Sequence, residues 1–138
     1  VVRDLVVNRA AFDRIIAAGG YISVRVGSAP EANALPIGKD CADSAFTSAQ
    51  CIGCGACAAV CPNSSAMLFV CAKANHLNGL PQGQPERELR TRNMLAQMKK
   101  EGFGDCTNNL LCQASCPKSI SVENIEQVRR EFPNLTGK

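Results

Sequence analysis

The sequence has few of the side chains that usually dominate a protein core. Only 4% of its 138 residues are aromatic, and tryptophan is absent. We therefore expect a core built from aliphatic side chains and phenylalanine. No run of about eighteen apolar residues is present, so the sequence predicts no membrane-spanning helix. The net charge of +3 is too small to indicate binding to nucleic acid, DNA included, or to an anionic membrane.

Catalytic patterns are missing from the sequence as well. It contains no recognisable pair of nucleophile and base and no glycine-rich phosphate loop. His76 is the only histidine, and a lone histidine is more often structural than a metal ligand. The sequence therefore predicts that the chain has no catalytic residues of its own.

Cysteine, in contrast, is abundant, with nine residues in the chain. Seven of them fall into two short runs, and an odd total does not suit a complete set of disulfides. Metal-bound thiolates in a reducing compartment explain this pattern better than a disulfide framework does. The other two, Cys41 and Cys71, lie outside the runs. We expect each to be a small packing residue, buried or half exposed.

The first run has three cysteines with two residues between neighbours, then a fourth cysteine after three more residues, then proline: Cys51, Cys54, Cys57, Cys61 and Pro62. This is the ligand spacing of bacterial ferredoxins, in which the fourth cysteine binds the other cluster of a two-cluster protein. Gly53 and Gly55 let backbone N–H groups approach the sulfurs. We expect Cys61 to lie on a short helix that Pro62 ends. Zinc sites, the main alternative, use separated cysteine pairs.

The second run repeats this frame, but Asn109 stands where a cysteine is expected: Cys106, Asn109, Cys112, Cys116 and Pro117. If each Cys-Pro cysteine binds the cluster of the other run, four thiolates suit a 4Fe–4S cluster: Cys51, Cys54, Cys57 and Cys116. Three thiolates remain for the second cluster: Cys61, Cys106 and Cys112. Because an amide is a poor ligand for iron in a sulfide cluster, the sequence predicts a 3Fe–4S cluster there. The clusters themselves would then fill much of the interior.

Hydrophobic periodicity and capping residues predict an all-α fold of short helices around the two clusters. The predicted helices cover residues 9–18 after Asn8, 40–49, a segment from Ser64 or Ser65 to about His76, a segment from Pro85 to about Lys100, and a segment from Ser121 to Phe132. Residues 21–26 alternate like an isolated strand, and residues 27–39 have the composition of a loop. A run of three arginines predicts either a solvated face or a docking surface for an acidic partner or lipid headgroups: Arg87, Arg90 and Arg92.

Three further segments flank the cysteine runs: Val2–Val7, Leu80–Gly83 and Gly102–Cys106. With them, the chain resembles the iron–sulfur subunit of succinate dehydrogenase and fumarate reductase, in its Bacteroidetes-like branch. The missing cysteine at Asn109 is part of this resemblance. The resemblance implies the alpha-helical ferredoxin fold for nearly the whole chain.

The same family has an N-terminal domain that holds a 2Fe–2S cluster. No cysteine run with the spacing of that domain precedes Cys41. We therefore expect residues 1–138 to be the C-terminal alpha-helical ferredoxin domain, with residues 1–8 as the linker from the absent 2Fe–2S domain. The 4Fe–4S and 3Fe–4S clusters would then be the only cofactors of this chain.

The resemblance also implies a route for electrons within the tricarboxylic acid cycle. They would pass between a separate flavoprotein subunit and a membrane quinone, either menaquinone or ubiquinone, bound with a cytochrome b anchor subunit. This chain would relay them through its two clusters and would not itself act on succinate or fumarate. Such a subunit lies peripherally on the cytoplasmic side of the bacterial inner membrane, and the isolated domain would be soluble.

Family positions that line the quinone pocket correspond here to two short stretches: Pro62, Asn63, Ser64, Ser65 and Thr107. Several relatives have tryptophan in the first stretch and histidine in the second, and this chain has neither. The simpler interpretation is that Asn63 and Ser64 cap the helix that follows Pro62. The functional interpretation depends on position alone, since both stretches adjoin expected ligands of the second cluster.

Three other classes of protein are alternatives. An iron–sulfur subunit of a heterodisulfide reductase or glycerol-3-phosphate dehydrogenase complex shares the two runs but normally carries four cysteines in each, so Asn109 argues against it. A free soluble ferredoxin tends to be shorter. A structural zinc module would be distinguished by metal analysis.

Overall fold

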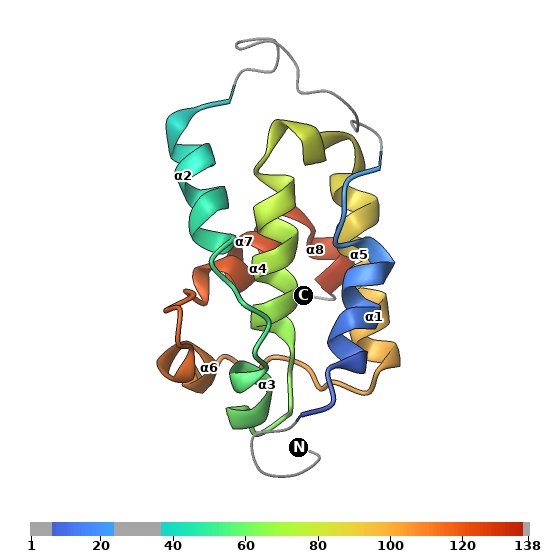
Figure 1. The fold of residues 1–138 in the computed structure, drawn as a ribbon, viewed down its shortest axis with the longest axis vertical. Helices are drawn as coiled ribbons and strands as arrows, with labels where there is room; N and C mark the ends of the chain where they lie inside the picture. The colour runs from blue at the N-terminus through green and yellow to red at the C-terminus, as the bar shows by residue number, and fades with distance from the viewer. Residues whose placement is uncertain (1–6, 24–36, 137–138) are drawn as a thin grey trace.

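The computed structural model describes residues 7–23 and 37–136, and over these ranges the chain forms helices and no β-strand (Figure 1). The α-helices are α1 (Ala10–Gly19), α2 (Lys39–Ser48), α3 (Ala56–Val60), α4 (Met67–Asn78), α5 (Arg87–Lys100), α6 (Leu111–Ser115), α7 (Glu123–Glu131) and α8 (Pro133–Thr136). A 3-10 helix, η1 (Pro81–Glu86), precedes α5. The predicted all-α class is confirmed.

The segment predicted to alternate like a strand, residues 21–26, is described only at residues 21–23. These three residues form no regular structure. The rest of that segment, and most of the loop predicted at 27–39, lie outside the described residues.

Helix α4 forms the centre of the fold, and most of its side chains are buried. Its first turn contributes Met67, Leu68, Phe69 and Val70, each less than a tenth exposed. A helix that is apolar on nearly all sides has to be surrounded, and α4 packs against α2, α5, α7 and η1. Figure 1 shows it running through the middle of the molecule. The aliphatic core expected from the composition is thus gathered around one helix.

Aromatic rings support one end of α4. Phe12 of α1 stacks on Phe69 of α4 with ring centroids 4.2 Å apart, and it lies 5.7 Å from Phe103. A Cβ atom built on Gly55 would lie 3.7 Å from the Phe12 ring, so the stack also contacts the first cysteine loop. The few aromatic residues of the chain therefore hold α1 and α4 against the segment that carries the first run.

The polar residues predicted to cap three helices each lie two residues before the first helical residue, one residue earlier in the sequence than a capping residue would. Arg9, Ala66 and Val122 directly precede α1, α4 and α7. The predicted side chains still accept a hydrogen bond from the first helical N–H of each helix, at 2.9 Å for Asn8, 3.2 Å for Ser65 and 3.1 Å for Ser121. They therefore satisfy one otherwise unpaired donor at each helix start.

Two helix boundaries differ from the prediction at prolines. The helix expected to start at Pro85 starts at Arg87, because Pro85 lies in η1. Phe132 interrupts the last predicted helix, and the short α8 follows from Pro133. The helix predicted to end near His76 continues to Asn78.

The three arginines of the run on α5 do not share one environment, since Arg92 is exposed to solvent and Arg90 is buried. Arg90 is 2% exposed and donates hydrogen bonds to the Asn78 side chain (2.6 Å) and the Gly83 carbonyl oxygen (3.0 Å). Arg87 and Arg92 form ion pairs within the chain: Arg87 with Glu131, and Arg92 with Glu88. Both predicted roles of this run are wrong for Arg90, which joins η1 to the helices on either side.

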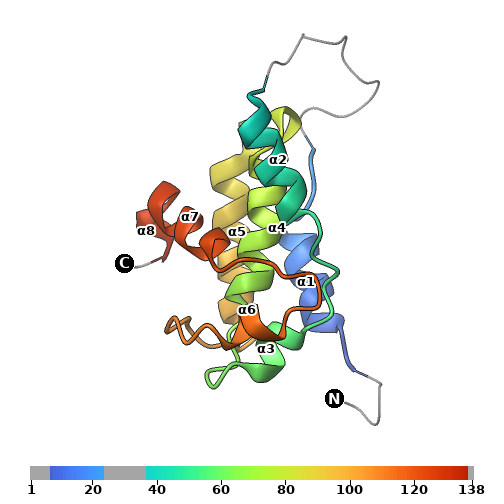
Figure 2. The same cartoon turned by 90° about the vertical axis from the view of Figure 1, so that its left-hand side faces the viewer.

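Both cysteine runs lie at one end of the molecule. Helices α3 and α6 pack against each other there, and Figures 1 and 2 show them side by side beyond the start of α4. The fold therefore brings together two segments that are far apart in the sequence.

Candidate metal centres

The two cysteine runs have the same backbone conformation. Each contains three residues with positive φ, at equal distances from its first cysteine: Gly53 and Asn108 (66° and 60°), Gly55 and Leu110 (82° and 63°), and Ser64 and Ser119 (52° and 54°). Each then forms a five-residue helix, α3 or α6, whose last residue precedes a Cys-Pro pair. The internal repeat read from the cysteine spacing is therefore also a repeat of backbone geometry.

Cys61 and Cys116 come immediately after these short helices. Their backbones are extended, with ψ of 129° and 119°, so each residue ends its helix. We expected Cys61 to lie on the helix, and that placement is wrong by one residue. The following turn is closed by a hydrogen bond from Ser64 N to the Cys61 carbonyl oxygen (3.0 Å) and from Ser119 N to that of Cys116 (3.1 Å).

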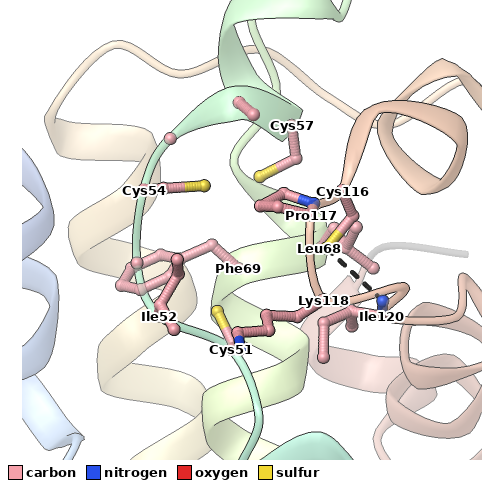
Figure 3. Close-up of a pocket in the computed structure, with 13 residues that line it drawn as sticks. Cys51, Ile52, Cys54, Cys57, Leu68, Phe69, Cys116, Pro117, Lys118 and Ile120 are labelled. Atoms are coloured by element: carbon pink, nitrogen blue, oxygen red, sulfur yellow. Dashed lines mark hydrogen bonds between the residues drawn. The ribbon is translucent and has the colours of Figure 1, made fainter.

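The first site lies between the first loop and the turn after α6. Four cysteines line one pocket, shown in Figure 3: Cys51, Cys54, Cys57 and Cys116. The other side chains around it are mainly apolar: Ile52, Leu68, Phe69, Pro117 and Ile120. The backbone N–H of Ile120 donates to the Cys116 sulfur (3.4 Å), the bond drawn in Figure 3. Burial raises the pKa of the Cys57 thiol to about 11. A bound cation is therefore needed to keep that sulfur ionised at neutral pH.

The second site is lined by the remaining three cysteines of the runs and by Asn109: Cys61, Cys106, Asn109 and Cys112. Its lining also has the neutral polar side chains of Ser65 and Asn108, whereas the lining of the first site includes the charged side chain of Lys118. The fold thus divides the seven cysteines into the two groups proposed from the sequence.

Asn109 is held in a defined orientation within the second site. Its Oδ1 accepts a hydrogen bond from Leu111 N (3.1 Å), so its Nδ2 lies toward Cys61, 3.7 Å from the sulfur. Burial opposes ionisation of Cys61, but backbone N–H groups of Ser65, Asn63 and Ser64 and the Asn109 amide outweigh it and lower the pKa of this thiol. Asn109 therefore presents a donor where the repeat would place a thiolate.

Arg129 also contacts the second site, and the sequence analysis did not identify it. Its guanidinium donates to the Asn108 side-chain oxygen (2.9 Å) and to the Cys106 carbonyl oxygen (3.3 Å). Its side chain is only 14% exposed, and it forms an ion pair with Glu126 (3.0 Å). The only sequence signal is its position next to Val128 on the buried stripe of α7, which does not by itself indicate a site residue.

The two cysteines outside the runs have different environments. Cys71 is fully buried in the core, where burial raises the pKa of its thiol, as expected for a packing residue. Cys41 is exposed, with its sulfur 3.5 Å from the Gly79 carbonyl oxygen, so our expectation of a buried or half-exposed thiol is wrong there. Both lie outside the linings of the two sites.

The donor set fits an iron–sulfur cluster better than a single ion. Within residues 7–23 and 37–136, no three His, Cys, Asp or Glu side chains converge closely enough to hold one metal ion. A tetrahedral zinc site with Zn–S bonds of 2.3 Å would bring its sulfurs to about 3.8 Å from one another. Here the sulfurs surround pockets instead, as a body larger than one ion requires.

The two stretches suggested for quinone binding lie next to each other. Asn63 Nδ2 donates to the Thr107 hydroxyl (3.0 Å) and to the Asp105 carbonyl oxygen (3.2 Å). Ser65 is 6% exposed and caps α4, whereas Ser64 occupies the left-handed region. The simpler interpretation, that Asn63 and Ser64 cap the helix, is therefore wrong, because Ser65 does so.

Comparison with known families matches one model, the 4Fe–4S dicluster domain, over residues 47–120. The match covers more than half of the chain and includes all seven cysteines of the two runs. Searches of curated proteins and of solved structures return no match. No helix in the described part of the chain is long and apolar enough to cross a membrane.

Proposed function

The chain belongs to the family of 4Fe–4S dicluster domains, and on that premise we propose that it is the electron-transfer domain of a succinate dehydrogenase or fumarate reductase iron–sulfur subunit. The family itself establishes electron transfer mediated by iron–sulfur clusters, with 4Fe–4S clusters as the cofactor class. The finer assignment depends on the resemblance of the cysteine runs and on Asn109.

The second site carries this proposal. A dicluster domain normally supplies four cysteines to each cluster, but this site has three cysteines and an amide whose nitrogen lies 3.7 Å from the Cys61 sulfur. Three thiolates with no fourth ligand favour a 3Fe–4S cluster. The combination of one 4Fe–4S and one 3Fe–4S cluster supports the proposed subunit over the alternatives that carry four cysteines in each run.

When bound, the clusters supply reversible one-electron chemistry, and the protein holds the two sites close together. Each short helix has a ligand for one site on it and a ligand for the other directly after it. Cys57 and Cys61 are four residues apart, as are Cys112 and Cys116. One helical turn of four residues rises about 6 Å, so the covalent path between the sites is short.

The surroundings of the two sites favour one direction of transfer within the domain. The lining of the first site is mainly apolar apart from Lys118, and one backbone N–H, from Ile120, donates to its Cys116 sulfur. At the second site, the Asn109 amide and several backbone N–H groups donate to the Cys61 sulfur. Hydrogen bonds to cluster sulfurs make a cluster easier to reduce. We therefore place the second site at the quinone end, beside a cytochrome b anchor subunit, and the first site toward a 2Fe–2S domain and a flavoprotein subunit.

Iron analysis of anaerobically purified protein tests the assignment. We expect about seven irons per chain and no stoichiometric zinc, with one centre paramagnetic when oxidised and the other when reduced. About eight irons, with no signal from an oxidised three-iron centre, would overturn the subunit assignment while leaving the dicluster function intact. Stoichiometric zinc without iron would overturn both.

A further inference from the structure

A cation from outside the ligand runs contacts each site at the same atom. The first cysteine of each run occupies an equivalent position, and its carbonyl oxygen accepts a hydrogen bond from a basic side chain. Lys73 Nζ of α4 donates to Cys51 (2.9 Å), and Arg129 Nη2 of α7 donates to Cys106 (3.3 Å). Helices α4 and α7 each follow the Cys-Pro pair of one run, and Lys73 and Arg129 lie 22 and 23 residues after Cys51 and Cys106, so the two contacts occupy nearly equivalent places in the repeat.

We propose that Lys73 and Arg129 are positioning residues, each of which fixes the first cysteine of one site and makes the centre bound there easier to reduce. Neither side chain is a ligand. This inference rests on the proposed binding of clusters. It extends that proposal by naming the residues that set the two reduction potentials separately.

The physical reason is electrostatic. Reduction adds one electron to a centre, and a fixed positive charge nearby stabilises the additional negative charge. The effect is larger where the cation is shielded from water, because solvent and salt screen exposed charges. Both cations also restrain the loop that carries the first cysteine, so removing either one loosens a ligand as well as removing a charge.

Arg129 should have the larger effect of the two. It bridges Cys106 and Asn108, so it holds both ends of a tight segment in which Asn108 has positive φ. Its counter-ion, Glu126, is 52% exposed and therefore neutralises it only partly.

Lys73 has fewer contacts with its cysteine loop and more solvent around it. It makes a single hydrogen bond to the first loop and borders a cavity of about 430 Å³. That cavity is also lined by Arg9, Asp13 and His76, so other charges and water share the space. We therefore expect its influence on the first centre to be in the same direction but smaller.

Redox titration of both centres in the full chain tests the proposal. Dithionite supplies the electrons through soluble mediators, and EPR follows each centre separately. In Arg129→Gln, the oxidised-to-reduced ratio of the second centre at a fixed potential should rise about tenfold, which is 59 mV for one electron. The first centre should not shift. In Lys73→Gln the ratio of the first centre should rise instead, by a smaller factor, and the second centre should not shift.

Two further variants separate this role from a general charge effect. Arg130→Gln removes the same charge at the neighbouring, exposed position and should shift neither centre. Glu126→Gln removes the counter-ion of Arg129 and should shift the second centre in the opposite direction, making it easier to reduce. Arg129→Lys keeps the charge but not the bridge between Cys106 and Asn108. The reduction potential of the second centre should therefore stay nearer to the wild-type value than it does in Arg129→Gln.

The outcomes distinguish this role from the proposed function. Two results would overturn the positioning role in a protein that still binds both centres. One is that Arg129→Gln and Arg130→Gln shift the reduction potential of the second centre equally. The other is that neither Arg129→Gln nor Lys73→Gln shifts the reduction potential of any centre. If Arg129→Gln fails to retain the second centre, the sign of the Glu126→Gln shift decides instead. Wild-type protein without iron at the second site would overturn the proposed function and this role together.

Discussion

The two cysteine sites have the same backbone but different surroundings. Matched residues adopt positive φ in both loops, and both turns after the Cys-Pro pairs close with the same hydrogen bond. The side chains around them, however, differ. Ile52, Phe69 and Ile120 line the first site, whereas Asn108 and Asn109 line the second. The repeat therefore preserves the geometry that holds a metal centre, while the residues around it have diverged.

This difference separates two tasks. The positive-φ positions and the short helices determine where the sulfurs lie. We propose that the amide and guanidinium groups near Cys61 and Cys106 set how readily a centre at the second site accepts an electron. In the proposed function, one motif provides two centres with different reduction potentials, which is the requirement for directed transfer.

The largest expected effect concerns the exchange of ligands between the runs. Cys116 belongs to the second run but lines the first site, and Cys61 shows the converse arrangement. Cys116→Ala should abolish the four-iron centre and leave the three-iron signal, and Cys61→Ala should do the opposite. Iron content and EPR of the two variants measure this. Loss of the second centre in Cys116→Ala would mean that each run binds its own centre.

The next largest effect is expected from a substitution that makes the two sites more alike. Asn109→Cys supplies the fourth thiolate that the repeat predicts, so the second centre should convert toward 4Fe–4S. Its reduction potential should fall, because another thiolate adds negative charge around the iron. The change also removes the acceptor of the Leu111 N–H, at a cost of about 1 kcal/mol in helix capping. A three-iron centre with an unchanged potential would show that residue 109 does not face the open corner.

A smaller effect tests the shared backbone. Gly55 and Leu110 occupy matched positions with positive φ, but only glycine adopts that conformation without strain. Gly55→Ala has space, since its nearest neighbour would be Phe12 at 3.7 Å, yet should cost about 1–2 kcal/mol in backbone strain. Leu110→Gly relieves a similar strain but raises the conformational entropy of the unfolded chain. Because the two effects oppose each other, the free energy of unfolding should change by less than about 1 kcal/mol.

Thermal unfolding under anaerobic conditions measures both variants. At about 4 °C per kcal/mol, Gly55→Ala should lower the midpoint clearly and Leu110→Gly should change it little. Leu110 is 52% exposed, so loss of its side chain removes little packing. A large fall in Leu110→Gly, equal to that of Gly55→Ala, would show that the leucine side chain contributes more than the backbone does.

The residues in the runs were informative because their spacing has one dominant chemical meaning. Cysteine spacing predicted the repeat and the two groups of sulfurs, and hydrophobic periodicity with capping residues predicted the all-α class. Capping residues such as Ser65 and Ser121 located helix starts to within one or two residues. These features are local, so a short stretch of sequence contains the information that determines them.

The errors concern contacts between distant segments. Arg90 belongs to a basic run on a helix, and only the tertiary structure shows that it is buried against Asn78 and Gly83. Lys73 and Arg129 reach the cysteine loops from α4 and α7, and their similar positions, 22 and 23 residues after Cys51 and Cys106, do not by themselves indicate a contact. The cysteine spacing predicted how the seven sulfurs are grouped, but it did not indicate which basic side chains contact their loops.

The smallest expected effect concerns the quinone end of the second site. Ser64 and Thr107 lie on the two stretches that Asn63 joins, and both adjoin cysteines of that site. In the assembled complex with its anchor subunit, Ser64→Ala with Thr107→Ala should raise the KM for quinone about fivefold, as expected for about 1 kcal/mol of lost hydrogen bonding. Succinate oxidation with an artificial acceptor at the flavin should stay unchanged.

The repeat supplies a matched control for this double variant. Ser119 has the same backbone conformation as Ser64 (φ of 54° and 52°) but follows Cys116 of the first site. Alanine adds no backbone strain at either position, because serine already carries a Cβ atom there. Ser119→Ala should therefore leave the quinone KM unchanged. Equal losses of the double variant in the quinone and artificial-acceptor assays would indicate damage to folding or to cluster assembly. A change of the quinone KM in Ser119→Ala as large as in the double variant would remove Ser64 and Thr107 from the quinone site.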